Sequence, residues 1–308
     1  MGERAYLLGH PVSHSKSPVM YRAAFEALGL DWTYELLDCS DGGDARALIE
    51  ARGYLFLNIT MPHKPLAFEC ATHPTAAASL ARGANLLVVE EGGLFADNTD
   101  GVGCTDYLQR RGCGFSGARV AVCGTGPTAC AILHAAAAAG AARAALIGRD
   151  GSRAQARLDG YRAAASELAG EPSSAAGPFA QMALDEPLPP SEFAAFSYDA
   201  ASDELARADL IVDATSLGMN EGDPAPFDTA LLSPRQTVFD VVYGHGETAL
   251  VKAARALGCA VYDGEGMLVA QAVAVMRRVC AACGVSAGDV DLFAVMARAA
   301  GFSALENV

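Results

Sequence analysis

The protein has 308 residues, a length that favours two domains at about 150 residues per domain. Its composition, 52% hydrophobic and 19% charged, excludes an intrinsically disordered chain. The formal net charge is −14, and such an acidic surface repels phosphate backbones and anionic lipids. We therefore expect a small-molecule ligand and neither a nucleic-acid nor a membrane partner. An anionic ligand would need a locally positive site.

The nine cysteines are odd in number and irregular in spacing. The N-terminal residues lack the long apolar segment of a secretory signal, so we expect reduced thiols in a cytoplasmic protein. Cys280 and Cys283 form one CxxC pair without a second, which favours core packing, and we expect no metal. Residues 120–142 carry no Lys, Arg, Asp or Glu and reach membrane-spanning length. Two glycines and a proline within them favour a strand, a turn and a helix instead.

In the first hundred residues, apolar runs and turn residues alternate. They predict strands at 5–9, 32–38 and 54–60, helices at 17–28 and 45–52, and a short helix after Pro62. Ser17 is predicted to be the N-cap of the first helix. A hairpin is expected over 86–95, with its turn at Gly92-Gly93. This alternation implies a mostly parallel sheet covered on both faces.

A second alternating series begins near residue 105. It predicts helices over 105–111, 130–139, 267–283 and 290–300, and strands over 119–123, 144–148, 210–214 and 238–242. The stretch from Glu171 to Ser197, rich in Pro, Ser, Ala and acidic residues, is predicted to be a surface insertion. The whole pattern indicates an α/β protein.

Residues 124–129 follow a predicted strand and fit the pattern G-x-G-x-x-A. The first glycine permits a tight turn, the second lets a pyrophosphate approach the backbone, and the alanine lets helix and strand pack closely. The helix N-terminus would present N–H groups to the phosphates. The motif predicts a dinucleotide site formed by Gly124, Thr125, Gly126, Pro127, Thr128 and Ala129. An ordinary strand-to-helix turn is the alternative.

The residues after the next strand bear on the choice of nicotinamide cofactor. Arginine there accommodates the 2′-phosphate of NADP, whereas an acidic residue bonds the ribose hydroxyl of NAD. Arg149 and Arg153 favour NADP, and Asp150 favours NAD. The sequence therefore indicates NADP and leaves NAD open.

Polar residues end the third predicted strand. Asn58 and Thr60 share one face, and Lys64 follows at the kind of strand end where parallel sheets bind ligands. Lys64 could act as an acid–base group held in place by Asp100, although a lone lysine is more often a solvated charge.

Two further segments could hold a polar ligand. Ser15 and Ser17 lie at a helix start, where hydroxyls, N–H groups and the helix dipole suit a carboxylate. Gln271 would place an amide on the inner face of a C-terminal helix.

Together these segments resemble the shikimate dehydrogenase family over nearly the whole chain. The matching pieces, in family order, are residues 9–11, 14–18, 58–64, 84–85, 98–103, 124–129, 213–219, 240–243 and 266–271. Each piece is short, but their ordered combination is specific to that family.

The resemblance implies an N-terminal α/β substrate domain and a Rossmann NAD(P)-binding domain, with C-terminal helices packing back on the first. On this basis we expect the substrate domain over 1–104 and 264–308, and the Rossmann domain over 105–263. The implied activity is the reversible, NADP-dependent reduction of 3-dehydroshikimate to shikimate, a step toward chorismate and aromatic amino acids. A monomer or a homodimer is expected.

The resemblance also implies residue roles. Lys64 and Asp100 are the implied catalytic pair. The substrate carboxylate is assigned to Ser15, Ser17 and Tyr243, and the ring hydroxyls to Asn58, Thr60, Asn85, Asp100 and Gln271. The nicotinamide end of the cofactor is assigned to Thr215, Gly218 and Met219, and Gly264 is expected to contribute to the cofactor site.

Two alternatives stay open at this point. A quinate/shikimate dehydrogenase that uses NAD is suggested by Asp150. A non-catalytic binding or regulatory protein on the same fold is the other alternative, and Lys64 and Asp100 argue against it.

Overall fold

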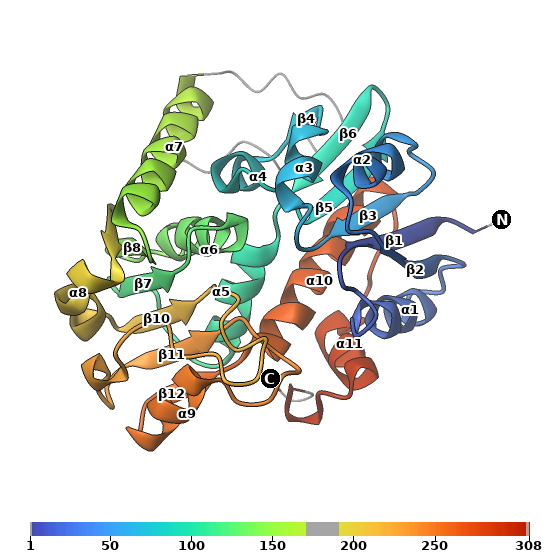
Figure 1. Cartoon of the computed structure of the whole chain (residues 1–308). Helices are drawn as coiled ribbons and strands as arrows, with labels where there is room; N and C mark the ends of the chain where they lie inside the picture. The colour runs from blue at the N-terminus through green and yellow to red at the C-terminus, as the bar shows by residue number, and fades with distance from the viewer. Residues whose placement is uncertain (1, 171–190, 306–307) are drawn as a thin grey trace. The chain divides into compact units, whose positions relative to one another are not determined.

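The computed structural model describes residues 2–170, 191–305 and 308. These residues form two compact units, each built on one six-stranded sheet. The first unit consists of 2–103 with 269–305 and 308, and the second of 104–170 with 191–268. The chain passes from the first unit to the second within α5 (Asp100–Arg110) and returns within α10 (Gly264–Ala282) (Figure 1).

The sheet of the first unit has the strand order β2-β1-β3-β5-β6-β4. Its strands are β1 (Arg4–Gly9), β2 (Thr33–Asp38), β3 (Phe56–Ile59), β4 (His73–Pro74), β5 (Leu86–Glu90) and β6 (Gly93–Asp97). Strand β1 pairs in parallel with β2 and β3, whereas β5 is antiparallel to β3 and β6. Asn58 pairs with Leu86, which brings the carboxyl end of β3 beside the start of β5.

The helices of the first unit cover this sheet. They are α1 (Ser17–Ala27), α2 (Gly42–Glu50), α3 (Lys64–Glu69), α4 (Ala76–Ala81) and α11 (Leu292–Ala300), with a short 3-10 helix at Ser303–Leu305. Small side chains from α2, α3 and α4 enter one core with β1 and β3, among them Ala45, Ala67 and Ala78. Helix α11, red in Figure 1, packs along α1, which is blue. The C-terminal helices thus complete the first unit, as the family resemblance implied.

Several predicted boundaries in the first unit are wrong, and two of them have a clear physical reason. Helix α2 begins at Gly42 and not at residue 45, because the Asp41 carboxylate accepts hydrogen bonds from two N–H groups of its first turn. The β5–β6 turn lies one residue earlier than predicted. Gly92 supplies the positive φ of +93°, and Gly93 already belongs to β6.

The sheet of the second unit is wholly parallel, with the order β12-β11-β10-β7-β8-β9. Its strands are β7 (Arg119–Cys123), β8 (Arg143–Gly148), β9 (Glu192–Ser197), β10 (Leu210–Asp213), β11 (Thr237–Asp240) and β12 (Ala260–Tyr262). The strand order reverses between β7 and β10. In doubly wound sheets, ligands bind at the carboxyl ends of the strands at such a switch point.

Four helices belong to the second unit besides the helices that link it to the first. They are α6 (Pro127–Ala138), α7 (Gly151–Gly170), α8 (Ser202–Arg207) and α9 (Ala249–Ala256), with short 3-10 helices at Tyr198–Ala200 and Thr229–Leu231. Helix α6 packs on β7 and β8, and α8 and α9 bury Leu205, Leu250 and Ala254 against the sheet.

Three predictions in this half are corrected by the structure. Helices α5 and α6 begin at Asp100 and Pro127, earlier than residues 105 and 130. The first turn of α5 contains an aspartate and two glycines, and α6 begins with a proline directly after Gly126, so neither start shows a helical pattern. The predicted insertion ends before Glu192, where β9 begins and pairs with β8. The rest of that prediction, residues 171–190, lies outside the described residues.

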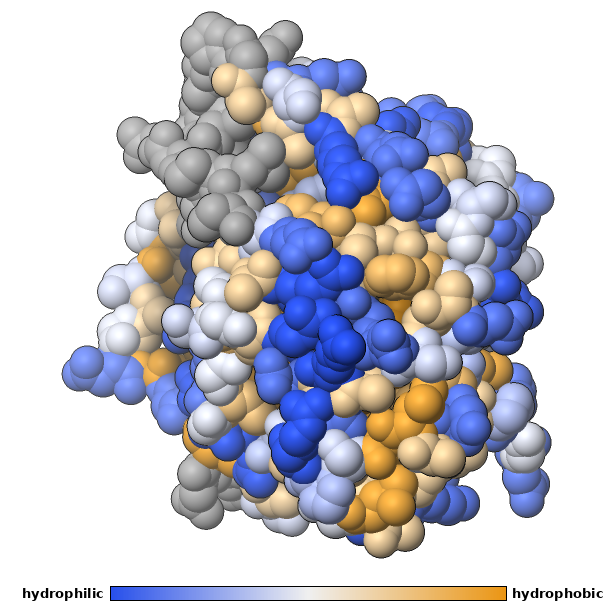
Figure 2. Space-filling model, turned by 90° about the vertical axis from the view of Figure 1, so that its left-hand side faces the viewer, coloured by the Kyte–Doolittle hydropathy of each residue, from blue (hydrophilic) through white to orange (hydrophobic). Residues whose placement is uncertain are grey.

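On the face shown in Figure 2, hydrophobic areas lie beside a stripe of hydrophilic residues. Within the described ranges, the large hydrophobic residues that are exposed are Val19, Leu48, Met61 and Leu257. No helix in the described part of the chain is long and apolar enough to cross a membrane. Residues 120–142 form most of β7, a turn and α6.

Candidate active site

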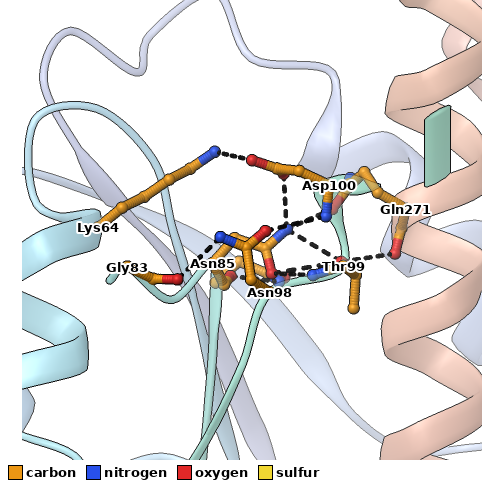
Figure 3. Close-up of polar contacts among 8 residues, drawn as sticks. Lys64, Gly83, Asn85, Asn98, Thr99, Asp100 and Gln271 are labelled. Carbon is orange, nitrogen blue, oxygen red and sulfur yellow. Dashed lines mark hydrogen bonds and ion pairs between the residues drawn. The ribbon is translucent and has the colours of Figure 1, made fainter. Parts of the chain in front are cut away.

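Lys64 is the first residue of α3, which follows the buried strand β3 after a turn of four residues. Its Nζ donates a hydrogen bond to Asp100 Oδ2 at 2.5 Å (Figure 3). The two side chains are only 16% and 7% exposed. A cation and a carboxylate that bury one another in this way have fixed positions, as acid–base groups require.

Asn85 connects this pair to the rest of the site. Its Nδ2 donates to Asp100 Oδ1 at 2.8 Å and to Thr99 Oγ1 at 2.9 Å, and its Oδ1 accepts the Thr99 N–H at 2.8 Å. Both carboxylate oxygens of Asp100 are therefore bonded, one to Lys64 and one to Asn85 (Figure 3).

Gln271 comes from α10, far along the chain, and lies at the same site (Figure 3). Its main-chain carbonyl accepts from Thr99 Oγ1 at 3.2 Å, and its side-chain oxygen lies 3.4 Å from Asn85 Nδ2. Gly103 permits this approach, because a Cβ there would come within 2.7 Å of the Gln271 backbone nitrogen.

Two site residues had no role assigned from the sequence: Asn98 and Thr99. Asn98 is buried, donates from Nδ2 to the Gly83 carbonyl at 2.8 Å and accepts the Asp100 N–H at 3.1 Å. Thr99 is wholly buried between Asn85 and Gln271. The polar run that ends at Asp100, placed directly after an apolar strand, was the available signal.

Ser15 and Ser17 lie together at the start of α1. Ser17 is not the N-cap that was predicted. Helix α1 already begins there, because Lys16 has a near-helical backbone with φ −82° and ψ −7°. Ser15 Oγ instead accepts the Ser17 N–H at 3.2 Å, and Pro18 follows inside the first turn.

Asn58 lies near the end of β3, and Thr60 directly follows that strand. Asn58 is buried, accepts from the Tyr34 hydroxyl at 2.8 Å and donates to the Asn85 carbonyl at 3.3 Å. The methyl group of Thr60 lies over Gly9, where a Cβ would overlap it. The first unit thus bonds Lys64 and Asn85 to one buried carboxylate and links Asn58 to the Asn85 main chain, an arrangement that suits a small ligand with several hydroxyl groups.

The Gly-rich turn of the second unit lies at the carboxyl end of β7, at the switch point. Gly124 has φ +123°, and a Cβ there would lie 2.9 Å from the Ala214 carbonyl oxygen. Gly126 faces open space, with nothing within 4 Å of its would-be Cβ, and Ala129 is fully buried. A tight turn, an open approach at the second glycine and the start of a long helix fit a dinucleotide pyrophosphate.

Arg149, Asp150 and Arg153 follow β8 and are exposed. Asp150 Oδ1 accepts three hydrogen bonds, from Ser152 N–H at 2.8 Å, Ser152 Oγ at 2.6 Å and Arg153 N–H at 3.2 Å. These bonds lower the pKa of the Asp150 carboxyl, with the Ser152 hydroxyl as the largest cause. Asp150 therefore caps α7, a role the sequence did not suggest.

The loop after β10 carries three more of the predicted cofactor residues, Thr215, Gly218 and Met219. The Thr215 N–H donates to Asp213 Oδ1 at 2.9 Å, and Gly218 has φ +96° with the Thr248 side chain where a Cβ would stand. Met219 closes the turn by donating its N–H to the Ser216 carbonyl at 3.3 Å. All three belong to the second unit.

Tyr243 and Gly264 also belong to the second unit, whereas Ser15 and Ser17 belong to the first. Burial raises the pKa of the Tyr243 hydroxyl. A Cβ on Gly264 would overlap the Val241 carbonyl, so only glycine fits there.

Among the described residues, no three His, Cys, Asp or Glu side chains gather in a way that could hold a metal ion.

Known proteins resemble this chain over most of its length. Residues 7–87 match the family model described as the shikimate dehydrogenase substrate binding domain. The chain is 36% identical over 276 residues to a shikimate dehydrogenase (NADP(+)) from Rubrobacter xylanophilus, covering 88% of each chain.

Solved structures with the same fold differ in what their names say they act on. One is the quinate dehydrogenase from Corynebacterium glutamicum in complex with NAD, at 28% identity and TM-score 0.74, covering 90% of this chain and 93% of that one. Another is the 5-ketofructose reductase of a Gluconobacter strain, at 25% identity and TM-score 0.73, covering 98% and 99%.

A parallel sheet with a Gly-rich dinucleotide turn, together with these relatives, defines an NAD(P)-dependent oxidoreductase. The chain belongs to the shikimate dehydrogenase family.

Proposed function

We propose that this protein is an NADP-dependent shikimate dehydrogenase, which interconverts 3-dehydroshikimate and shikimate. The observation that carries the proposal is the Lys64–Asp100 pair, bonded at 2.5 Å and held from the other side by Asn85. The nearly 90% coverage of an NADP-dependent relative supports it. In the reductive direction the reaction would serve chorismate and aromatic amino acid synthesis, in a cytoplasm that keeps thiols reduced.

Lys64 has two roles in the reduction. As the substrate carbonyl is reduced, negative charge grows on its oxygen, and the Lys64 ammonium stabilises that charge and supplies the proton. Asp100 keeps the ammonium directed by accepting one of its N–H groups. In the reverse direction the same lysine takes the proton from the shikimate hydroxyl.

The remaining groups of the first unit hold the ring. Asn58, Thr60, Asn85 and Gln271 would bond the ring hydroxyls. Ser15 and Ser17 would bond the carboxylate at the start of α1, with Tyr243 as a further partner. Such a site rejects analogues that lack a hydroxyl, because the missing bond leaves a buried polar group unpaired.

The second unit would hold the dinucleotide. When bound, the nicotinamide supplies the hydride. Residues Gly124 to Ala129 would receive the pyrophosphate. Because the Asp150 carboxylate is occupied as the cap of α7, we assign the 2′-phosphate to Arg149 and Arg153. This assignment favours NADP over NAD.

The test is nicotinamide reduction by purified protein with shikimate and quinate, each against NADP and NAD. Fast turnover only with shikimate and NADP would support the proposal. Turnover with quinate or NAD would move the protein to the quinate/shikimate type that Asp150 first suggested. If folded protein that binds cofactor shows no turnover with any of the four pairs, it is either a non-catalytic binding protein or an enzyme for another substrate.

The cofactor assignment has its own variant. Arg149→Ala should raise the KM for NADP about tenfold, since hydrogen bonds to charged groups contribute about 1.5–3 kcal/mol, and should leave the KM for NAD nearly unchanged. Arg207→Ala, an exposed arginine at the end of α8, is the matched control. Equal losses for both cofactors in Arg149→Ala would refute the 2′-phosphate assignment.

A further inference from the structure

Asp97 is a buried carboxylate that the proposed reaction does not use. It is the last residue of β6, three residues before Asp100, and is wholly buried. Its Oδ1 accepts from Thr75 Oγ1 at 2.7 Å and from the Asn98 N–H at 2.8 Å. Its Oδ2 forms an ion pair with Nε of Arg278. A charge this deeply buried requires such a partner.

Arg278 lies on α10, seven residues after Gln271. Seven residues are about two helical turns, so the two side chains leave the helix on the same face. Helix α10 is thus tied to one short segment twice. The Gln271 main-chain carbonyl accepts the Thr99 hydroxyl, and the Arg278 guanidinium forms an ion pair with the Asp97 carboxylate.

A chain of hydrogen bonds links Asp97 to the catalytic pair. Asp97 orders the Asn98 main chain, and the Asn98 side chain accepts the Asp100 N–H at 3.1 Å. The Asp100 carboxylate in turn accepts a hydrogen bond from Lys64 Nζ. Figure 3 shows the end of this path, from Asn98 through Asp100 to Lys64.

We propose that Arg278 is a positioning residue. By pairing with Asp97 it fixes the 97–100 turn against α10, and through that turn it sets where Asp100 holds Lys64. The inference rests on the proposed function for its kinetic consequence, but its structural consequence can be measured without any substrate.

The competing explanation is that the Asp97–Arg278 ion pair only stabilises the fold. A double variant distinguishes this explanation from a positioning role. Arg278→Met leaves Asp97 buried without its partner, so both the Tm and kcat should fall, kcat about ten- to a hundredfold as for a slightly misplaced catalytic group. In Asp97→Asn with Arg278→Met no charge is left unpaired, so the Tm should recover. If Arg278 positions Asp100, kcat stays low in that double variant.

Arg277→Met is the matched control, because Arg277 is the neighbouring residue on α10 and is exposed. It should leave Tm and kcat unchanged. Recovery of kcat together with Tm in the double variant would overturn the proposal, and so would an unchanged kcat in Arg278→Met.

A readout without substrate distinguishes this inference from the proposed function. The chain has three lysines, Lys16, Lys64 and Lys252, which peptide mass spectrometry resolves. Acetic anhydride should label Lys64 several-fold faster in Arg278→Met and in the double variant than in the wild type, with Lys16 and Lys252 unchanged. Unchanged labelling of Lys64 would overturn the positioning role, whichever substrate the enzyme proves to use.

Discussion

At the scale of single residues, Lys64 makes the sharpest prediction. Lys64→Ala should lower kcat at least about a hundredfold, the low end for acid–base catalysis, because it removes the cation that is paired with Asp100. The substrate KM should change little, whereas the Tm should fall, because Asp100 is left buried without its cation. Steady-state kinetics and a circular dichroism melt check both.

Lys252→Ala is the control for that experiment, since Lys252 is an exposed lysine on α9. It should behave as the wild type. Near-normal turnover in Lys64→Ala would remove Lys64 from the mechanism and leave the pair with Asp100 as a structural contact.

Asp213 predicts a dependence of stability on pH. It ends β10, is 1% exposed, and lies opposite Asp240 of β11. Burial, and then the Asp240 carboxylate, raise the pKa of Asp213 to about 7. Between its unfolded value near ~4 and that folded value, the folded protein holds a proton that the unfolded chain does not. This contribution to stability is present below pH ~4 and is lost as the pH rises to about 7.

Asp213→Asn should abolish the loss of stability that ionisation of Asp213 causes. The amide keeps the oxygen that accepts the Thr215 N–H and carries no charge. The variant should gain free energy of unfolding over the wild type at pH 8, and less at pH 5.5, in urea titrations. Asp203→Asn, an exposed carboxylate on α8, controls for net charge. An equal gain at both pH values would mean that Asp213 is ionised throughout this range.

At the scale of elements, helix α7 depends on its cap. Asp150→Ala should lower the Tm, because the first-turn N–H groups of Ser152 and Arg153 lose their acceptor. Asp150→Ser keeps a capping oxygen, so its Tm should be close to that of the wild type. Neither variant should raise the KM for NAD. A marked rise of that KM in Asp150→Ala would instead place Asp150 on the ribose.

Elements with a strong apolar or glycine signal could be predicted from the sequence, and the others could not. Strand β7 has the predicted bounds because it is a continuous apolar run ended by Gly124. Helix α4 consists largely of alanine, and β4 has two residues, so neither carries a periodic pattern. Strand β9 was missed because it follows a Pro- and acid-rich stretch and lies at the sheet edge, half buried.

Some residues of the candidate site could likewise be predicted from the sequence, and others could not. Lys64 and Asp100 could be named because each follows an apolar strand within a recognisable polar run. The Asp97–Arg278 pair could not, since its two residues are far apart in the chain and only the packing of α10 on the first unit brings them together. The capping role of Asp150 could not be predicted, because a capping carboxylate and a ribose-binding one look alike in sequence.

At the scale of the whole molecule, all nine cysteines are unpaired. Mass spectrometry after unfolding in an alkylating agent, without reductant, should therefore find nine modified thiols. The Tm should be the same with and without dithiothreitol. Fewer modified thiols, or a Tm that falls on reduction, would reveal a disulfide and contradict the reduced state.

The divided chain of the first unit has a consequence for biosynthesis. When the ribosome has released residue 268, every residue of the second unit has emerged, but the first unit still lacks Gln271, Arg278 and α11. Because domains fold as units, the second unit can fold first, while α1 waits for the helix that covers it. The unit that leaves the ribosome first is thus completed last. The interval between the two is a period of exposure to chaperones and proteases that the second unit does not share.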